Sequence, residues 1–75
     1  MKNNSTPLYA ILVFRTDDVF FGYWLGKNEK SPFDSISINN ARDFGTHEIC
    51  AQEIITAREF AKENGWNLSF KVYGQ

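Results

Sequence analysis

The chain has 75 residues, a formal net charge of −1 and an aromatic content of 16%. Its single cysteine excludes an intrachain disulfide, and one cysteine with one histidine falls short of the roughly four ligands that a structural zinc site takes. The balanced charge provides no basic footprint for duplex DNA or for an anionic membrane, and a chain this short is marginally stable unless dense packing or a partner adds to its core.

The beginning of the chain and its longest apolar run give no sign of export or of a membrane span. The run Leu8–Phe14 is far shorter than the roughly 20 residues that cross a bilayer. The opening MKNNSTP has no apolar segment after its lysine, so we expect no signal peptide. We expect residues 1–7 to be a flexible arm, residues 8–75 to be one domain, and the protein to be cytoplasmic, with a reduced thiol and no cofactor.

The first apolar part of the chain predicts a β-hairpin. The segments Leu8–Arg15 and Val19–Gly26 are rich in branched and aromatic side chains, which favour strands. Between them, Asp17 and Asp18 follow Thr16, and aspartates bond to the nearby backbone and tolerate turn geometry. We therefore interpret the two carboxylates as turn formers rather than as a paired-carboxylate site.

The segment between the hairpin and the helix is less regular. Residues 27–34 are a polar loop that is broken by Pro32. The following SISIN, residues 35–39, alternates between polar and apolar side chains and places Ile36 and Ile38 on one face. Such alternation predicts a short third strand.

The clearest pattern is a helix over residues 47–64. Thr46 precedes it and can cap it, because its hydroxyl can accept a backbone N–H of the first turn. Gly65 suits the left-handed residue that ends a helix, and Trp66 then lies where an apolar side chain often folds back on the last turn. The next segment, residues 67–73, alternates between polar and apolar side chains and predicts a last strand.

One side of this helix carries an apolar stripe with a carboxylate inside it. At about 100° per residue, the apolar members of the stripe are Ile49, Cys50, Ile54, Ala57, Phe60 and Ala61. Glu53 falls among them. Its carboxylate either reaches water at the edge of the stripe, or pairs with a buried donor such as Tyr9, Tyr23 or Trp66, or points into a cavity. Ile55 lies on the opposite, polar side.

These elements define the expected fold. A hairpin, a third short strand, a helix and a last strand follow one another in the order β-β-(β)-α-β. We expect an α+β domain with a three- or four-stranded, mostly antiparallel sheet and one helix packed on one face.

Both strands of the hairpin place large apolar side chains on both faces, although one helix covers only one face. Strict alternation puts Phe20 and Trp24 on the same face, and a register slip of one residue would exchange the faces. One explanation is that Phe33, Trp66 and residues 1–7 fold over the second face. The other explanation, which we favour, is that a protein partner or a second copy of the chain covers this face. A patch built from Tyr9, Ile11, Val13, Phe20 and Trp24 would exceed the apolar surface that monomers usually expose.

Aromatic side chains would be the anchors of such an interface, since Trp and Tyr are frequent at energetically important contacts. The expected contact residues are Tyr9, Phe20, Tyr23, Trp24 and Trp66. Gly22 either leaves a gap that a partner enters or marks a bulge or bend. The same aromatic strand is typical of sheets that stack single-stranded nucleic acid. We keep that function as the alternative. Its positive groove would have to come from Arg15, Lys27, Lys30 and Lys71, and the net charge of −1 argues against it.

The residues capable of chemistry do not predict an enzyme. His47 lies at the helix start without a Ser or Cys nucleophile and an orienting acid nearby, so we interpret it as a surface histidine. Cys50 lies in the first helical turns. A helix N-terminus can activate a thiol, but we favour the interpretation that Cys50 is a small buried apolar residue.

The order of elements resembles that of a group of small proteins. A hairpin is followed by the segment Ala41-Arg42-Asp43-Phe44, a Thr-capped helix, and a last strand that begins shortly after a glycine. This arrangement is similar to many very small α+β proteins of phages and other mobile elements. Some of these inhibit bacterial defence systems or host enzymes by binding a protein surface. The resemblance therefore implies a protein-binding inhibitor that acts by steric occlusion, with no catalytic residue.

Overall fold

The computed structural model describes residues 8–34, 38 and 41–74. The arm expected at residues 1–7, and Ile36 of the expected third strand, lie outside these residues. The described part of the chain forms four strands and one helix, in the order β1 (Tyr9–Arg15), β2 (Phe20–Trp24), β3 (Phe33–Asp34), α1 (His47–Glu63) and β4 (Leu68–Gly74).

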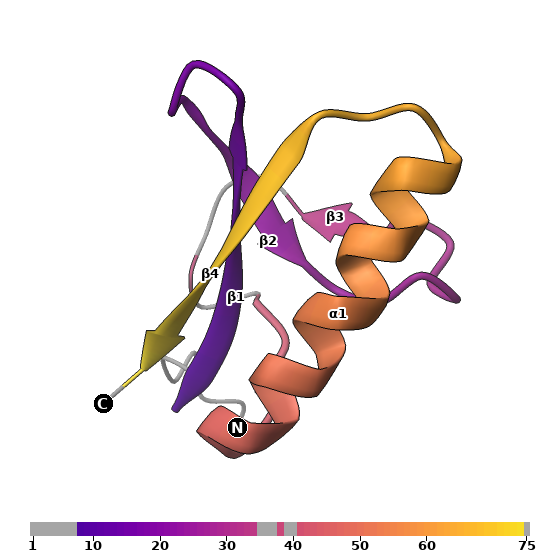
Figure 1. Cartoon of the computed structure of the whole chain (residues 1–75). Coiled ribbons are helices and arrows are strands. Elements are labelled where there is room, and N and C mark those ends of the chain that lie inside the picture. The colour runs from indigo at the N-terminus through magenta and orange to yellow at the C-terminus, as the bar shows by residue number, and fades with distance from the viewer. Residues whose placement is uncertain (1–7, 35–37, 39–40, 75) are drawn as a thin grey trace.

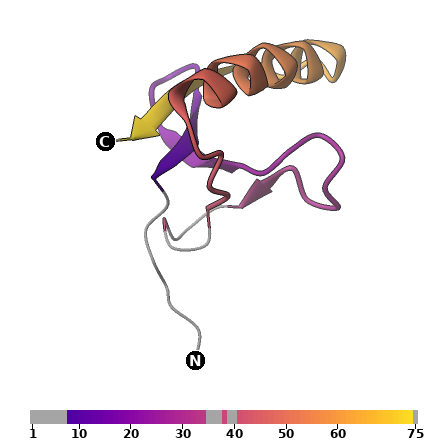
Figure 2. The ribbon, with the colours of Figure 1, turned by 90° about the horizontal axis from the view of Figure 1, so that it is seen from below.

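The strands form one antiparallel sheet in the order β3-β2-β1-β4, and α1 packs across one face of it (Figure 1, Figure 2). The long strands β1 and β4 pair along their length, from Tyr9 opposite Gly74 to Arg15 opposite Leu68. The helix lies on this sheet because its buried stripe and one face of the strands are both apolar. The predicted α+β fold, with an antiparallel sheet and a helix on one face, is confirmed.

The third strand lies earlier in the chain than the sequence pattern predicts. It pairs with the end of β2, with Phe33 opposite Trp24, in a segment that was expected to be loop. Ile38, in contrast, accepts a hydrogen bond from Ala41 N at 3.1 Å and lies in a turn. The prediction of a strand that includes Ile38 is wrong, because alternation over so short a segment does not distinguish a strand from a local turn.

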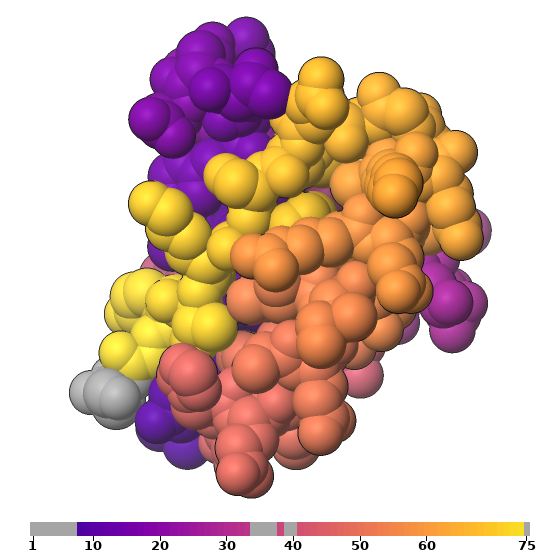
Figure 3. Space-filling model, in the orientation of Figure 1, coloured from indigo at the N-terminus to yellow at the C-terminus, as the bar shows by residue number. Residues whose placement is uncertain are grey.

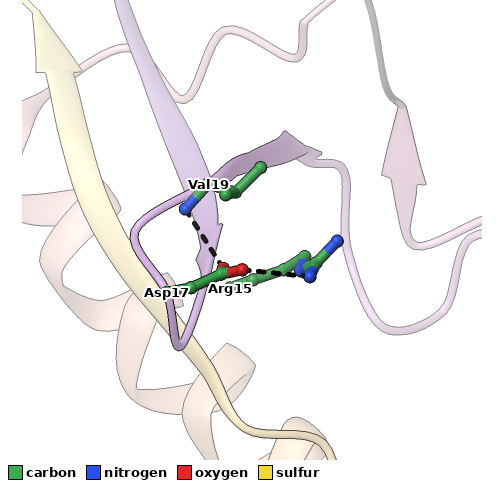
Figure 4. A network of polar contacts seen from close by, with 3 residues as sticks. All are labelled: Arg15, Asp17 and Val19. Carbon is green, nitrogen blue, oxygen red and sulfur yellow. Dashed lines mark hydrogen bonds and ion pairs between the residues drawn. The ribbon is translucent and has the colours of Figure 1, made fainter.

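Local hydrogen bonds close the turn between β1 and β2. Asp18 N donates to Arg15 O at 2.9 Å, and Arg15 N donates to Val19 O at 2.9 Å. Asp17 Oδ1 accepts from Val19 N at 3.4 Å, while Asp17 Oδ2 lies 3.1 Å from Arg15 Nη2 (Figure 4). Asp18 has a φ of 62°, a left-handed conformation that aspartate adopts more readily than most residues. The two aspartates shape the turn, as the sequence predicts.

A β-bulge interrupts the ladder between β1 and β2. Val13 pairs with Gly22, but Phe14, the next residue of β1, pairs with Phe20. Phe21 is therefore an extra residue without a partner in β1, which is the definition of a bulge. The alternative that Gly22 marks a bulge is correct, since Gly22 is the residue next to it.

The bulge separates Phe20 from Trp24. The ring of Phe20 meets the ring of Phe14 at a centroid distance of 5.7 Å on the face away from α1, whereas Trp24 belongs to the core on the helix side. The expectation that these two side chains share a face is wrong, because strict alternation assumes a regular ladder. One extra residue in a strand moves every side chain beyond it to the opposite face of the sheet.

Thr46 caps the start of helix α1, and Gly65 follows its C-cap in the predicted left-handed conformation. Thr46 Oγ1 accepts from Ile49 N at 3.1 Å, which satisfies one of the free N–H groups of the first turn. At the other end Gly65 has a φ of 72°, and Trp66 N donates to Ala61 O at 2.8 Å, the pattern of a glycine-ended helix. The helix ends one residue earlier than predicted, at the residue before its C-cap.

The core lies between α1 and the sheet. Its buried members are Ile11, Val13, Trp24, Phe44, Cys50, Ile54, Ala57, Ala61 and Phe70. Ile49, which was predicted for the buried stripe, is 47% exposed. The buried side chains of α1 centre on Cys50 and Ala57, and Ile49 lies about 100° around the helix axis from Cys50, so it falls outside this narrower face. Ile55 is exposed, as expected.

Candidate functional site

The face of the sheet away from α1 carries a cluster of large apolar side chains, which we call the outer face: Leu12 and Phe14 of β1, with Phe20 and Tyr23 of β2. Neighbouring rings meet edge to face, with centroids 5.7 Å apart for Phe14 and Phe20 and 5.1 Å apart for Phe20 and Tyr23. None of the four belongs to the core cluster, and Phe20 is 41% exposed. Because cross-strand pairs hold these rings, the outer face is a preformed apolar surface.

Strand β4 adds polar groups beside the outer face. The register places Ser69 opposite Phe14, Lys71 opposite Leu12 and Tyr73 opposite Ala10. Nζ of Lys71 lies 5.2 Å from the centre of the Phe14 ring, a cation–π contact. On the other side of the sheet, α1 lies against β4 and β1 (Figure 3). Among the described residues, α1 thus covers one face and leaves the outer face without a helix.

Trp24 does not lie on a surface. Its side chain is 0% exposed, and its ring packs against the rings of Phe33, Phe60 and Phe70 at centroid distances of 5.5, 5.8 and 5.9 Å. Its Nε1 donates to Glu53 Oε2 at 2.9 Å. The expectation that Trp24 contacts a partner is corrected by this burial, and the cause is the bulge, which places Trp24 opposite the helix.

Glu53 holds the buried indole from α1. Its side chain is half-buried, and its carboxylate accepts the one polar hydrogen that Trp24 would otherwise bury without a partner, at a cost of about 1–3 kcal/mol. Of the alternatives that the sequence leaves open, pairing with a buried donor is the observed one. The donor is Trp24 and not Tyr9, Tyr23 or Trp66, and Trp24 lies on the face that meets the helix.

A groove opens on the helix side of the sheet, between β2, β3 and the end of α1, and we call it the aromatic groove. Its volume is about 570 Å³, and it is lined by Phe21, Pro32, Phe33, Gly65, Trp66, Asn67 and Leu68. The rings of Phe21 and Phe33 are 5.2 Å apart, and those of Phe33 and Trp66 are 5.6 Å apart. Sequence reasoning found Trp66 but missed Phe21, for which Gly22 was the available signal of a bulge.

Tyr9 lies at the opposite end of the helix side, beneath the start of α1. It packs against the core, and its ring meets the exposed His47 edge-on at 6.4 Å. The five residues expected at one interface are therefore divided among four places: the outer face (Phe20 and Tyr23), the aromatic groove (Trp66), the start of α1 (Tyr9) and the core (Trp24).

Cys50 is a buried structural thiol. Its Sγ lies 4.0 Å from Ala10 O. Burial raises the pKa of the Cys50 thiol above its ordinary value, and the negative charges of Asp43 and Glu53 raise it further. A higher pKa leaves less of the reactive thiolate at neutral pH. The interpretation of Cys50 as a small buried residue is confirmed.

Asp43 ties the segment before α1 to β1. Its Oδ1 accepts from Gly45 N at 2.9 Å and from Tyr9 N at 3.3 Å, and Phe44 N donates to Tyr9 O at 2.9 Å. The hydrogen bond from Gly45 contributes most to lowering the pKa of the Asp43 carboxyl below its ordinary value of 3.8. Desolvation opposes this shift, and the N–H groups of Leu8 and Tyr9 reinforce it.

The described residues contain neither a cluster of metal ligands nor a helix that could span a membrane. In residues 8–34, 38 and 41–74, no three His, Cys, Asp or Glu side chains gather in a way that would hold a metal ion. The helix in this part of the chain lacks the length and the apolarity to cross a bilayer. No protein-family model, curated protein or solved structure matches the chain. The outer face and the aromatic groove are the features on which a function can be argued.

Proposed function

We propose that this chain is a small protein-binding module without catalytic activity, and that the outer face is its contact surface. The observation that supports this most directly is the cluster of Phe14, Phe20 and Tyr23, whose rings touch on a face away from α1. Rings that already pack against one another lose little conformational freedom when a partner covers them. Aromatic side chains of this kind are frequent anchors of protein interfaces.

The partner that suits the outer face best is a second copy of the chain, with the two sheets packed face to face. Of the residues that β1, β2 and β4 place on this face, Lys71 alone is charged, and it lies over the Phe14 ring; the edge strand β3 adds Asp34, which the register places opposite Tyr23. Because β3 is the edge strand of the sheet, the apolar centre of this face can meet its own copy across a two-fold axis with Asp34 at the rim. Sheets that pack in this way lie about 10 Å apart, which leaves room for interleaved aromatic side chains.

Such a module would act by steric occlusion, covering part of its target without changing it chemically. The likeness to small proteins of phages and mobile elements supports an inhibitor of a bacterial protein in the cytoplasm. A face-to-face dimer leaves the aromatic groove free, because the groove lies on the helix side of the sheet. The two surfaces can therefore serve different partners.

The experiment that tests the dimer compares two neighbouring residues of β2. Phe20→Ala and Phe21→Ala each remove a ring that is about two-fifths exposed, but the first ring lies on the outer face and the second lines the groove. Sedimentation velocity over a concentration series should show dimers for the wild type and for Phe21→Ala, and monomers for Phe20→Ala. The proposal is wrong if all three remain monomers, or if Phe21→Ala is the variant that loses the dimer.

Single-stranded nucleic acid is the competing occupant of the outer face. It requires a positive groove along the aromatic rings. In the part of the chain that the structure describes, Lys71 is the one cation that the register places on this face, and Arg15 is 3.1 Å from Asp17 in an exposed ion pair. Titration with a labelled oligothymidylate distinguishes the two functions. Tight binding that weakens steeply with added salt would replace the protein partner by a nucleic acid, and no binding is expected.

A further inference from the structure

The aromatic groove adjoins a second hollow that is basic. This hollow has a volume of about 310 Å³ and is lined by Arg58, Ala61 and Lys62 of α1, together with Gly65, Trp66, Asn67 and Leu68. The last four residues also line the groove. The segment from Gly65 to Leu68 is therefore a shared wall, with aromatic rings on one side of it and two cations on the other.

The two cations of this hollow are available to an anionic ligand. Arg58 and Lys62 are four residues apart in α1, so they lie on the same side of the helix. Both are exposed, and neither forms an ion pair with any residue in the described part of the chain. Since the whole chain has a net charge of −1, the positive charge here is a local feature of the surface.

The groove is open to solvent along its length. Phe21 is 43% exposed and Trp66 is 39% exposed, although the rings of both contact Phe33 and are held in place by it. Sites for small free ligands bury about 70–90% of the ligand surface. The aromatic groove is too open to bury a ligand to that extent. A side chain on a polypeptide suits it better, because the rest of the polypeptide can stay in solvent.

We propose that the groove and the basic hollow together bind an acidic segment of a protein partner. A large apolar side chain of the segment, such as Phe or Leu, enters the aromatic groove, and carboxylates of its neighbours pair with Arg58 and Lys62. Arginine can bind a carboxylate through two parallel hydrogen bonds, which adds geometric selectivity to charge attraction. This inference does not rest on the proposed dimer, because the outer face lies on the opposite side of the sheet.

The two tryptophans provide a direct readout for this site. Trp66 lines the groove and the hollow, whereas the indole N–H of Trp24 is buried and bonded to Glu53. The probe is the capped peptide acetyl-Glu-Asp-Leu-Phe-Asp-Glu-amide, added to full-length ¹⁵N-labelled protein. The indole N–H signal of Trp66 should shift saturably with peptide concentration, while the signal of Trp24 should stay in place.

Matched variants separate the roles of charge and of the apolar wall. The double variant Arg58→Gln, Lys62→Gln should weaken peptide binding by at least about tenfold, the size expected from losing one or two charged hydrogen bonds. Lys30→Gln, an exposed site that lines neither hollow, should change it by less than about twofold. Phe21→Ala should weaken it and Phe20→Ala should not. A far-ultraviolet circular dichroism spectrum like that of the wild type confirms that each variant is folded.

Three results would overturn the inference. The first is a Trp66 signal that does not respond to the acidic peptide. The second is equal binding of a peptide in which lysines replace the acidic residues, or an equal loss of affinity for Lys30→Gln. The third is a Trp66 shift produced by sodium laurate but not by the peptide, which would make the site a pocket for a free fatty acid. Failure of the dimer experiment affects none of these readouts.

Discussion

The outer face and the aromatic groove begin at neighbouring residues of β2, yet they are built in different ways. Phe20 belongs to the outer face and Phe21 to the groove, because the bulge at Phe21 shifts the register between them. On the outer face, cross-strand pairs on both sides of the bulge set the position of each ring. The groove is assembled from irregular parts, namely the bulge, a two-residue strand and a glycine-ended helix.

The comparison shows what each kind of backbone provides. Side chains held by cross-strand pairs form the face of a sheet, which suits packing against another sheet. Irregular backbone gives a concave surface, which suits a protruding side chain. Changes to the shared core should therefore damage both surfaces, whereas changes to one surface should leave the other intact.

Trp24→Ala should have the largest effect, because Trp24 joins the sheet to α1 beneath both surfaces. Removing so large a buried side chain costs about 3–5 kcal/mol, a large part of the stability of about 5–15 kcal/mol that small domains have. Urea denaturation followed by far-ultraviolet circular dichroism measures the loss. A loss below about 1 kcal/mol would contradict the enclosed position of Trp24.

Changes at Glu53 should have the next largest effect and should depend on the replacement. Glu53→Ala leaves the indole N–H of Trp24 without its acceptor, at a cost of about 1–3 kcal/mol. Glu53→Gln keeps an acceptor oxygen and should cost less than Glu53→Ala. The same urea denaturation compares the two variants. Equal losses for both would show that the hydrogen bond between the two side chains contributes little.

Gly65→Ala should weaken peptide binding to the aromatic groove and leave the outer face unchanged. Gly65 has a φ of 72°, and an added Cβ would meet nothing within 4 Å, so the cost of about 1 kcal/mol comes from the backbone. Gly45, with a φ of 89° and equally open surroundings, is the matched control. Both variants should lose similar stability, but only Gly65→Ala should weaken peptide binding. Equal effects of the two variants on peptide binding would contradict the assignment of the aromatic groove as the peptide site.

The smallest effect concerns Asp43, which touches neither surface. Because its pKa is lowered in the folded protein, its ionised form stabilises the fold above the ordinary pKa of 3.8, and this contribution is lost as the pH falls through the folded-state value. Asp43→Asn cannot titrate, so the difference in melting temperature from the wild type should shrink below about pH 4. A difference in melting temperature that stays constant down to strongly acid pH would contradict the lowered pKa of Asp43.

The parts of the fold that the sequence predicts are those with a local cause. Thr46 and Gly65 mark the helix ends, because capping depends on a few adjacent atoms. The two aspartates mark the hairpin turn for the same reason. Ile49 was placed wrongly, because periodicity identifies an apolar stripe but not how much of it the sheet covers.

The candidate surfaces were predicted less well, because they depend on strand register. An extra residue at Phe21 moved Phe20 away from Trp24, and a bulge is a property of two paired strands that one strand's pattern does not contain. Pairing of Phe33 with Trp24 likewise needs a partner distant in sequence. The general expectation of two apolar faces did not depend on register, and the outer face agrees with it.

The central claim is that the outer face packs against the outer face of a second copy. Isotope-filtered NOE spectra of a mixture of ¹³C-labelled and unlabelled chains test it most directly. The claim predicts intermolecular cross-peaks among the rings of Phe14 and Phe20 and the methyl groups of Leu12. Spectra without such cross-peaks at millimolar protein concentration, or with intermolecular cross-peaks only from the groove residues Phe21 and Trp66, would contradict it.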